Sequence, residues 1–477
     1  MVSRRGISPL RMSPLKEALH EANQVLKHNV LRKIRAAQRL DSRGNPTVQV
    51  TVITGKGKFT DIVPSGASKG DYEAVEIRDK DDRFYHGKGV LMAVHNVAEV
   101  LGPALVEKGF DVIKDREAID KFMIQRDGTP NKSKYGANAI LGISMAVNRA
   151  AAAAKDLPLY EFIRQESYLA TYWVIPTPFF NVLNGGKHSG SSMAFQEFMI
   201  APVGAKNFAD AVRMGSETYQ SLKVIIGKKF GQAATSVGDE GGFSPPISKP
   251  QEALDLLVEA VKDAGHEGDI AFGIDPASTE FYKSDGTYDL GFKTDTPEIF
   301  TAGQLANLYH DLIKKYPIIL LEDPFAQDDW DSWSSFKQEV GDRIELVGDD
   351  LLATNINRMR IAKKRQAVNS LLLKINQIGT ISEAVEAAHR ALRYGWRVFL
   401  SHRSGESTDD FIADLAVALG IGHFKCGAPC RGERVVKYNR VMDIEEESRR
   451  AGRHVVYAGR KFGDNIPIEV KEHGYIL

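Results

Sequence analysis

Short apolar runs alternate with stretches of helical periodicity through the second half of the chain. The helical stretches include residues 303–314 and 382–392, in which apolar residues recur every three or four positions. Six of the apolar runs end in polar or charged residues: IAFGID (270–275), PIILLED (317–323), IELVGDD (344–350), LLLKIN (371–376), RVFLSHRS (397–404) and HFKCGAP (423–429). Alternation of strand-like and helix-like segments predicts an α/β fold with a parallel sheet or barrel.

The polar ends of these runs form one candidate site. In a barrel of parallel strands the carboxyl ends converge on one rim, so the lead polar residues should meet there. They are Asp275, Glu322, Asp349, Lys374, His402 and Lys425. Three neighbouring carboxylates are costly to bury unless a cation compensates them, and a site with only oxygen ligands favours Mg²⁺ over Zn²⁺. Three separate structural salt bridges are the alternative interpretation.

Lys374 and the segment SHRS (401–404) suggest how such a site would treat a substrate. A lysine that leaves a buried strand beside other cations can have a lowered pKa and act as a base, although an ordinary ion pair with a carboxylate also explains it. Arg403 suits bidentate contact with a phosphate or carboxylate, and Lys425 would add a second cation. Together they indicate an anionic substrate, with a solvated polar loop as the alternative for SHRS.

Three glycine-rich loops add further polar candidates. They are VPSGASKG (63–70) with Ser65 and Ser68, LNGGKHSG (183–190) with His188 and with Gln196 and Glu197 shortly after it, and GDEGG (238–242) with Glu240. Glycine lets the backbone approach a ligand closely and lets a loop move. Each loop alone is weak evidence, because most glycine-rich turns are only turns.

The first third of the chain has a different pattern. Residues 46–54 alternate as a strand does, and a turn at 55–58 leads into a second apolar stretch, so a β-hairpin is expected. Residues 90–165 are helical in pattern. An α+β domain therefore precedes the alternating region, and the boundary is inferred from the change of pattern alone.

Composition narrows the classes of function. The 477 residues include 62 Lys+Arg and 62 Asp+Glu, and this balance argues against nucleic-acid binding. No stretch reaches the roughly 20 apolar residues that a membrane span needs. The two cysteines, Cys426 and Cys430, lack the CxxC spacing of zinc and redox sites, so we expect reduced thiols and a cytoplasmic protein. Residues 1–30 are basic and amphipathic, which leaves organelle targeting open beside a docked or frayed extension.

Taken together and in order, these segments resemble the enolase family over roughly residues 30–460. The segments that carry the resemblance are DSRGNPTV (41–48), VPSGASKG, DGTPNKSKYGANAILGIS (127–144), NVLNGGKHSG (181–190), QEFMIAP (196–202), GDEGG, LEDPFAQDDW (321–330), GDDLLATN (348–355), LLLKINQIGT (371–380), SHRSGE (401–406) and KCGAP (425–429).

The resemblance implies an α+β N-terminal capping domain followed by an enolase-type β/α barrel that departs from regular βα repeats in its first units. The expected division is an N-terminal extension (1–30), a capping domain (31–169), a barrel with the catalytic site (170–461) and a C-terminal tail (462–477). It further implies a homodimer that converts 2-phosphoglycerate to phosphoenolpyruvate with two Mg²⁺ ions per site, the second recruited with the substrate.

The resemblance also assigns roles to individual residues. Asp275, Glu322 and Asp349 would hold the first Mg²⁺, and Ser68 would contribute to the second. Lys374 would remove the proton from carbon 2, and Glu240, kept protonated and assisted by Glu197, would protonate the departing hydroxide. The residues implied at the substrate are His188, Glu197, Glu322, Asp349, Ser401, His402, Arg403, Ser404 and Lys425.

A few positions depart from the family's usual pattern. Lys69 stands where threonine is usual, Pro276 stands where valine is commoner, and residues 187–192 around His188 are atypical. Two alternatives to an active enolase therefore stay open. One is a weakly active paralogue with a structural or surface-binding role, and the other is a different acid dehydratase of the enolase superfamily.

Overall fold

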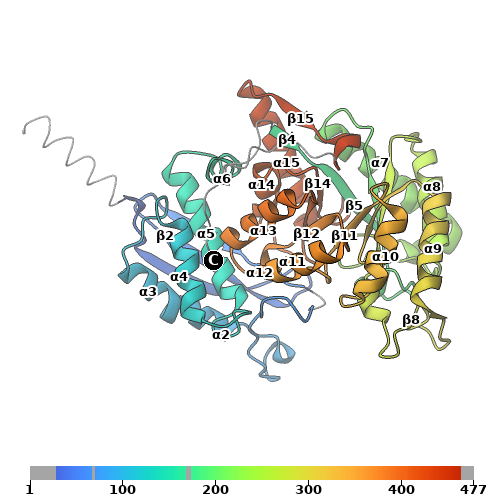
Figure 1. Ribbon diagram of the computed structural model, residues 1–477. Coiled ribbons are helices and arrows are strands. Elements are labelled where there is room, and N and C mark those ends of the chain that lie inside the picture. The colour runs from blue at the N-terminus through green and yellow to red at the C-terminus, as the bar shows by residue number, and fades with distance from the viewer. Residues whose placement is uncertain (1–27, 67–69, 168–172, 464–477) are drawn as a thin grey trace, which may run out of the picture.

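The computed structural model describes residues 28–66, 70–167 and 173–463. Figure 1 shows two parts, a smaller one at the N-terminal end of the chain and a barrel built from the rest. We call residues 28–66 and 70–167 the capping part. The predicted extension and tail lie almost wholly outside the described residues, as do Ser68 and Lys69.

The capping part contains a three-stranded antiparallel sheet in the order β1 (Lys33–Leu40), β2 (Pro46–Ile53) and β3 (Lys58–Ile62). The predicted hairpin is β2–β3, and its alternating residues Val48, Val50 and Val52 are fully buried. Strand β1 was not predicted, because only one of its eight side chains is buried and the sequence KIRAAQRL shows no apolar alternation.

Helices cover this sheet. The 18-residue helix α5 (Ala137–Ala154) packs on β2 and β3 and is buried along most of its length. The region 90–165, helical in pattern, divides into shorter elements, which are α2 (Leu91–His95), the π-helical turn η2 (Asn96–Leu101), α3 (Gly102–Glu107), α4 (Arg116–Asp127), α5 and α6 (Leu159–Ser167), after the 3₁₀ turn η1 (Tyr85–Gly87).

Eight strands close the barrel. Their order around it is β10 (Ile318–Glu322), β11 (Glu345–Gly348), β12 (Ser370–Leu373), β13 (Arg397–Ser401), β14 (His423–Lys425), β5 (Thr177–Asn184), β6 (Glu197–Ala201) and β7 (Ala271–Asp275). Strand β6 is antiparallel to both its neighbours and all other pairs are parallel. The predicted α/β fold and the expected irregular first units are confirmed.

Helices surround the barrel on its outside (Figure 1). Two of them, α7 (Phe208–Phe230) and α8 (Pro250–Asp263), separate β6 from β7. The later units carry α9 (Ala302–Lys315), α10 (Trp330–Val340), α11 (Ile356–Arg365), α12 (Ile375–Ile378), α13 (Ile381–Arg393), α14 (Phe411–Ala418) and α15 (Gly432–Arg450). Short additions are the strand pairs β4 (Trp173–Ile175) with β15 (Val455–Tyr457) and β8 (Tyr288–Asp289) with β9 (Ile299–Phe300), and the 3₁₀ turns η3 (Gly186–His188), η4 (Gln232–Thr235), η5 (Ser278–Phe281) and η6 (Gly459–Lys461).

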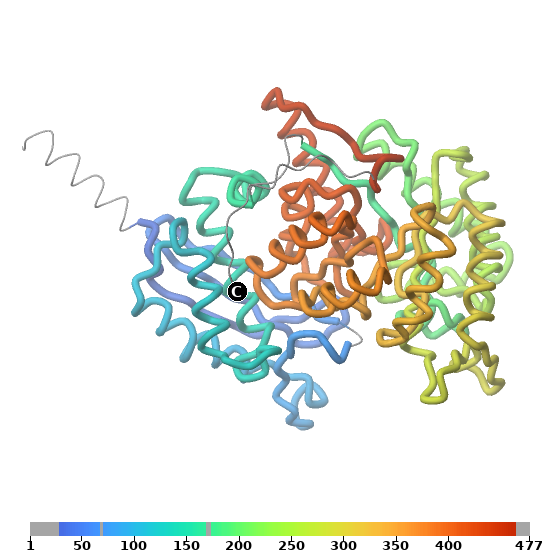
Figure 2. The backbone as a smooth tube through the Cα atoms, in the orientation of Figure 1, coloured from blue at the N-terminus to red at the C-terminus, as the bar shows by residue number. Residues whose placement is uncertain are grey.

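The capping part lies against the carboxyl-end rim of the barrel. Helix α5 runs beside α12 and α13 in both Figure 1 and Figure 2. Ser65 and Gly405 exchange two backbone hydrogen bonds of 2.8 Å, which ties the loop after β3 to the end of SHRSG. Residues 63–66, the described start of one of the predicted glycine-rich loops, are thereby held beside the barrel.

Arg149 on α5 links the two parts through charge. Its Nε lies 2.6 Å from Asp61 Oδ1 on β3, and its Nη2 lies 2.8 Å from Asp410 Oδ1 and 3.4 Å from Asp409 Oδ1 in the barrel. Burial and the charge of Asp409 raise the pKa of Asp61 well above its usual value. The guanidinium therefore separates carboxylates that would otherwise face one another in a dry interface.

Replacing Arg149 tests this link. We expect Arg149→Met to lower the free energy of unfolding by about 3–5 kcal/mol at neutral pH, because it leaves buried Asp61 without its cation. The loss should shrink as the pH falls, since a carboxyl with a raised pKa takes up its proton early and then carries no charge to repel Asp409. Urea unfolding of the variant at neutral and mildly acidic pH measures both effects.

The matched control is Arg213→Met, which removes an exposed arginine of α7 that pairs with Asp210 and Glu217. A surface pair of this kind contributes about 0–1 kcal/mol. An equal loss of unfolding free energy in the two variants would show that the contacts of Arg149 with Asp61, Asp409 and Asp410 contribute no more than a surface ion pair.

Candidate active site

A small polar cavity of about 30 Å³ is lined by residues at and after the carboxyl ends of the barrel strands. Four of the six polar residues predicted to meet at the strand ends line this cavity. The other two are Lys425, which hydrogen-bonds the lining residue Glu197, and Glu322, which accepts a hydrogen bond from Lys425. The lining residues are His188, Gln196, Glu197, Glu240, Asp275, Ala277, Glu280, Asp323, Asp349, Asp350, Lys374, Ser401, His402, Arg403 and Ser404. The expected convergence of strand ends is therefore present.

Lys425 lies beneath the cavity and bridges two carboxylates. Its Nζ donates hydrogen bonds of 3.0 Å to Glu197 Oε2 and 2.5 Å to Glu322 Oε2, and all three side chains are buried. Burial alone would lower the pKa of Lys425, but these carboxylates hold it well above its usual value. A full positive charge is thus fixed inside the barrel at the end of β14.

Two groups of carboxylates could hold a metal ion. Glu197, Asp275 and Glu322 offer oxygens that lie within 4.8 Å of one another, and so do Asp323, Asp349 and Asp350. Burial raises the pKa of Glu322 to about 8. Its Oε1 accepts no hydrogen bond from the described residues. An oxygen-only donor set with an orphaned carboxylate oxygen fits a hard cation such as Mg²⁺.

The ligand set named from the resemblance is divided between these groups. Asp275 and Glu322 belong to the first and Asp349 to the second. The second group adjoins the first, because Glu322 ends β10, Asp349 follows β11, and the charge of Asp349 contributes to the raised pKa of Glu322. Whether the three act together as ligands stays a prediction, and Ser68 lies outside the described residues.

Lys374 follows β12 and pairs directly with Asp349. Its Nζ donates a short hydrogen bond to Asp349 Oδ2, while Gln377 Nε2 donates to Asp349 Oδ1 over 2.8 Å. Burial opposes the charge on Lys374, but Asp349 outweighs it and the pKa of the lysine is raised. In this structure the candidate base is therefore a charged partner of a carboxylate.

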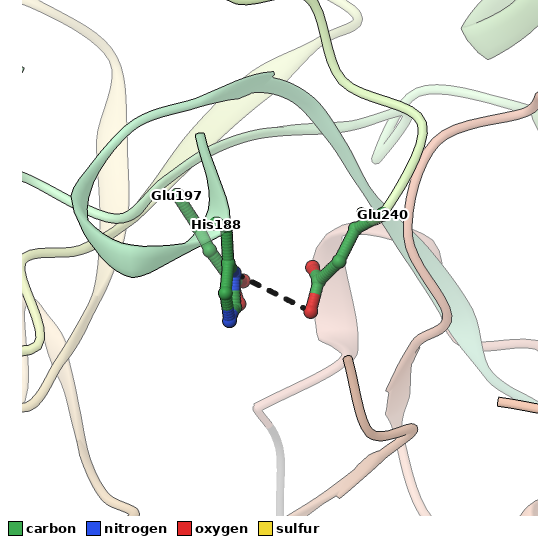
Figure 3. A group of neighbouring side chains, drawn as sticks. All are labelled: His188, Glu197 and Glu240. Atoms are coloured by element: carbon green, nitrogen blue, oxygen red, sulfur yellow. Dashed lines mark ion pairs between the residues drawn. The ribbon is translucent and has the colours of Figure 1, made fainter. Parts of the chain in front are cut away.

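His188, Glu197 and Glu240 lie close together and face one another (Figure 3). His188 Nδ1 lies 3.5 Å from Glu240 Oε1 and 3.7 Å from Glu197 Oε1. The three come from the loop after β5, the start of β6 and the GDEGG loop. Two of the predicted glycine-rich loops therefore place His188 and Glu240 beside Glu197, the first residue of β6.

The pKa values of Glu197 and Glu240 are shifted in opposite directions. Burial and the neighbouring Glu240 raise the pKa of Glu197. Burial would also raise the pKa of Glu240, but His402, His188 and Arg434 outweigh it and hold the pKa well below its usual range. The shift on Glu240 runs against the expectation that this carboxyl keeps a proton, and the shift on Glu197 favours its protonated form.

His402 is oriented by an arginine that the sequence did not indicate. Arg434 Nη1, on α15, donates a 2.5 Å hydrogen bond to His402 Nδ1, so the imidazole carries its proton on Nε2. That Nε2 lies 3.3 Å from Glu240 Oε2. Burial lowers the pKa of His402 to about 4.

Arg403 reaches the opposite edge of the cavity and meets the capping part. Its Nη1 lies 3.0 Å from Glu73 Oε2 and 3.2 Å from Asn376 Oδ1. Ser404 Oγ accepts a 3.3 Å hydrogen bond from Arg43, another capping-part residue. Ser401 turns its hydroxyl to the carbonyl of His402. The SHRS segment is a buried, hydrogen-bonded element and not a solvated loop.

Several residues of the site were missed by sequence reasoning. Asp323 and Asp350 adjoin predicted ligands in LED and GDD, so their carboxylates could have been suspected from adjacency. Glu73 and Arg434 carry no such signal, because each reaches the site from an element far away in the sequence.

Two family comparisons bear on this arrangement. The family model for the enolase N-terminal domain matches residues 31–163, and the one for the enolase C-terminal TIM barrel domain matches residues 172–466. The chain belongs to the enolase family. Enolases depend on Mg²⁺ in general and bind small phosphorylated carboxylates, which suits the carboxylate groups and the buried cations described above. Among the described residues, no helix combines the length and apolar character of a membrane span.

Metal binding to this enolase site should release protons. A carboxyl whose pKa is about 8 is protonated at neutral pH, so an ion that takes Glu322 as a ligand must displace that proton. We therefore expect Mg²⁺ affinity to increase from about pH 6 to about pH 9. Isothermal titration calorimetry in two buffers of different ionisation enthalpy measures the affinity and the number of protons released.

Glu322→Gln should weaken Mg²⁺ binding and flatten its pH dependence, because the amide does not titrate. Asp263→Asn, at an exposed position that ends α8, should leave both unchanged. A wild-type affinity that is independent of pH would contradict a protonated Glu322 in the metal-free site.

Proposed function

We propose that this chain is an active enolase, which reversibly dehydrates 2-phosphoglycerate to phosphoenolpyruvate in glycolysis and gluconeogenesis. One observation carries the proposal. Lys374 follows β12 and Glu197 begins β6, and these strands are four positions apart in a closed barrel of eight. The candidate base and the candidate acid pair therefore lie on opposite sides of one cavity that carboxylates and cations line.

Opposite placement suits an elimination that handles two faces of a small substrate. Lys374 Nζ takes the proton from carbon 2, the electron pair forms the new double bond, and the bond from carbon 3 to its oxygen breaks. The departing hydroxide takes a proton from the Glu197–Glu240 pair and leaves as water. Each side chain works as a general base or acid at the atom it faces.

Substrate recognition falls to the buried cations. Arg403 and Ser404 hold the phosphate, Lys425 lies against the carboxylate, and His188 approaches from its loop. Ser401 and His402 complete the wall of the site. Arg403 suits a phosphate because its planar guanidinium can donate two parallel hydrogen bonds.

Asp275, Glu322 and Asp349 would hold one Mg²⁺, and Ser68 would contribute to a second that arrives with the substrate. Enolase-superfamily enzymes are a standard case in which bound Mg²⁺ stabilises the negative charge that develops beside a lysine or histidine base. Lys374 must lose its proton before it can act. Asp349 raises the pKa of Lys374 in this structure, and a carboxylate engaged as a metal ligand would raise it less.

The remaining expectations complete the proposal. We infer a cytoplasmic homodimer, with an extension at 1–30, a capping domain at 31–169, a barrel at 170–461 and a tail at 462–477. All the catalytic and metal positions carried over keep the family's residue type, and this supports activity in spite of Lys69.

Turnover of 2-phosphoglycerate with and without Mg²⁺ tests the function. We expect Mg²⁺-dependent formation of phosphoenolpyruvate, followed by its ultraviolet absorbance, and a loss of kcat of about 10²–10⁴-fold in Lys374→Ala because the general base is gone. Lys374→Ala should also stop exchange of the carbon-2 hydrogen with deuterated water, whereas Glu240→Gln should impair dehydration and retain exchange.

Lys223→Ala, at an exposed position on α7, is the matched control and should keep full activity. A folded wild-type chain without turnover would overturn the proposal. Turnover that survives in Lys374→Ala would leave the reaction standing and remove Lys374 as its base.

A further inference from the structure

The turn that carries His188 is held from outside by a lysine of a different segment. Lys293 Nζ donates hydrogen bonds of 2.5 Å to the Gly186 carbonyl and 2.9 Å to the Ser189 carbonyl. These carbonyls flank His188, so one ammonium group fixes both ends of the three-residue turn. Lys293 belongs to the connection between β8 and β9, more than a hundred positions further along the chain.

The ammonium group of Lys293 hydrogen-bonds the backbone on both sides of His188. Lys293 is partly buried, and burial lowers its pKa. Within the described residues it forms no salt bridge with a carboxylate, so its two carbonyl acceptors take the place of water around the charge. A desolvated cation that is hydrogen-bonded to carbonyls is a strong local restraint, because charge-assisted hydrogen bonds are about twice as strong as neutral ones.

A second lysine reinforces the same attachment. Lys187, immediately before His188, forms a short ion pair with Glu280, which lies in η5 and lines the cavity. The side chain of Lys187 is half exposed, so this pair is the weaker of the two. Both lysines join the His188 turn to the stretch that follows the candidate metal ligand Asp275.

The stretch itself is well anchored. Phe281 stacks on Phe195 and packs against Phe292, the neighbour of Lys293. Asp275 Oδ1 accepts a 2.7 Å hydrogen bond from the amide of Ala277, which lies between β7 and η5. The His188 turn is thus attached to a rigid support, whereas three of its own residues between 185 and 190 are glycines.

We propose that Lys293 is a positioning residue that holds His188 at the substrate, with Lys187 as a secondary tether. The proposal rests on the proposed enolase function. Lys293 touches no reacting atom and acts only through the backbone on both sides of His188. Its loss lets the turn shift, and a shift of about 1 Å at a catalytic group can cost about 10²-fold in rate.

Steady-state kinetics of Lys293→Met tests the proposal. We expect kcat/KM for 2-phosphoglycerate to fall about 10- to 100-fold with little change in melting temperature. Lys187→Met should cost at most about fivefold, as expected for a half-exposed pair. Lys293→Arg, which keeps a charged donor, should recover part of the loss. Lys283→Met is the matched control, because Lys283 lies just before β8, is exposed and is 4.0 Å from Asp289.

Combination with His188→Gln separates positioning from a general structural effect. If Lys293 acts through His188, adding Lys293→Met to His188→Gln causes no further loss. Equal fold losses in both backgrounds, or full activity of Lys293→Met, would overturn the proposal. Should Lys293→Met fail to fold, Lys293→Gln replaces it, since the amide retains a donor for one carbonyl.

Hydrogen exchange of residues 185–192, read by mass spectrometry, does not depend on catalysis. Faster exchange confined to this stretch in Lys293→Met, and absent in Lys283→Met, supports the tether even if the wild type fails to turn over 2-phosphoglycerate, in which case only the proposed function falls. Unchanged exchange would show that Lys293 does not hold the turn.

Discussion

The contact of Lys425 with Glu197 and Glu322 is the constraint on which the rest of the site depends. Two carboxylates and one ammonium are buried together at the mouth of the barrel, and their contacts link β14 to β6 and β10. A buried ammonium persists only when it has hydrogen-bonding partners, because an unpaired buried charge costs several kcal/mol. The strand ends must therefore keep their relative positions, and the barrel provides the rigid frame that does so.

The capping part contributes charged and backbone groups to the surroundings of the site at the end of β13. Glu73 pairs with Arg403, the backbone of Ser65 pairs with Gly405, and Arg149 neutralises carboxylates from both parts. Each of these contacts places a capping-part group beside the SHRSG end of β13 or the segment just after it. The surroundings of Arg403 are consequently defined by the N-terminal third of the chain as much as by the strand that carries it.

Much of the fold was predictable because strand ends were marked by chemistry. A run such as LLLK or LLED is too apolar for a surface loop and ends in a charge, which places that charge at a strand terminus. The first barrel strand, β5, gave no such signal, since all eight of its side chains are buried and no alternation survives. Strand β1 failed for the opposite reason, with seven of its eight side chains at least partly exposed.

The sequence predicted the site residues that lie at the ends of recognisable strands, and it did not predict those that reach the site from elsewhere. Glu322 and Asp349 were found because each ends its own strand signal. Arg434 was not found, because it lies on helix α15, where nothing in the sequence distinguishes it from the other charged residues. Charge states were beyond pattern analysis altogether. The low pKa of Glu240 and the raised pKa of Glu197 depend on which side chains the fold brings within a few ångströms.

The lysines and the acidic groups of the site are paired with one another. Lys374 hydrogen-bonds Asp349, and Lys425 hydrogen-bonds Glu322 and Glu197, so the acidic groups best suited to a divalent cation are the ones that lysines now contact. A lysine cannot accept a proton while a carboxylate holds it charged. Any cation that takes over Asp349 would free Lys374 from the charge that raises its pKa. Through its hydrogen bond to Lys374, Asp349 therefore couples the protonation of the candidate base to the binding of a cation.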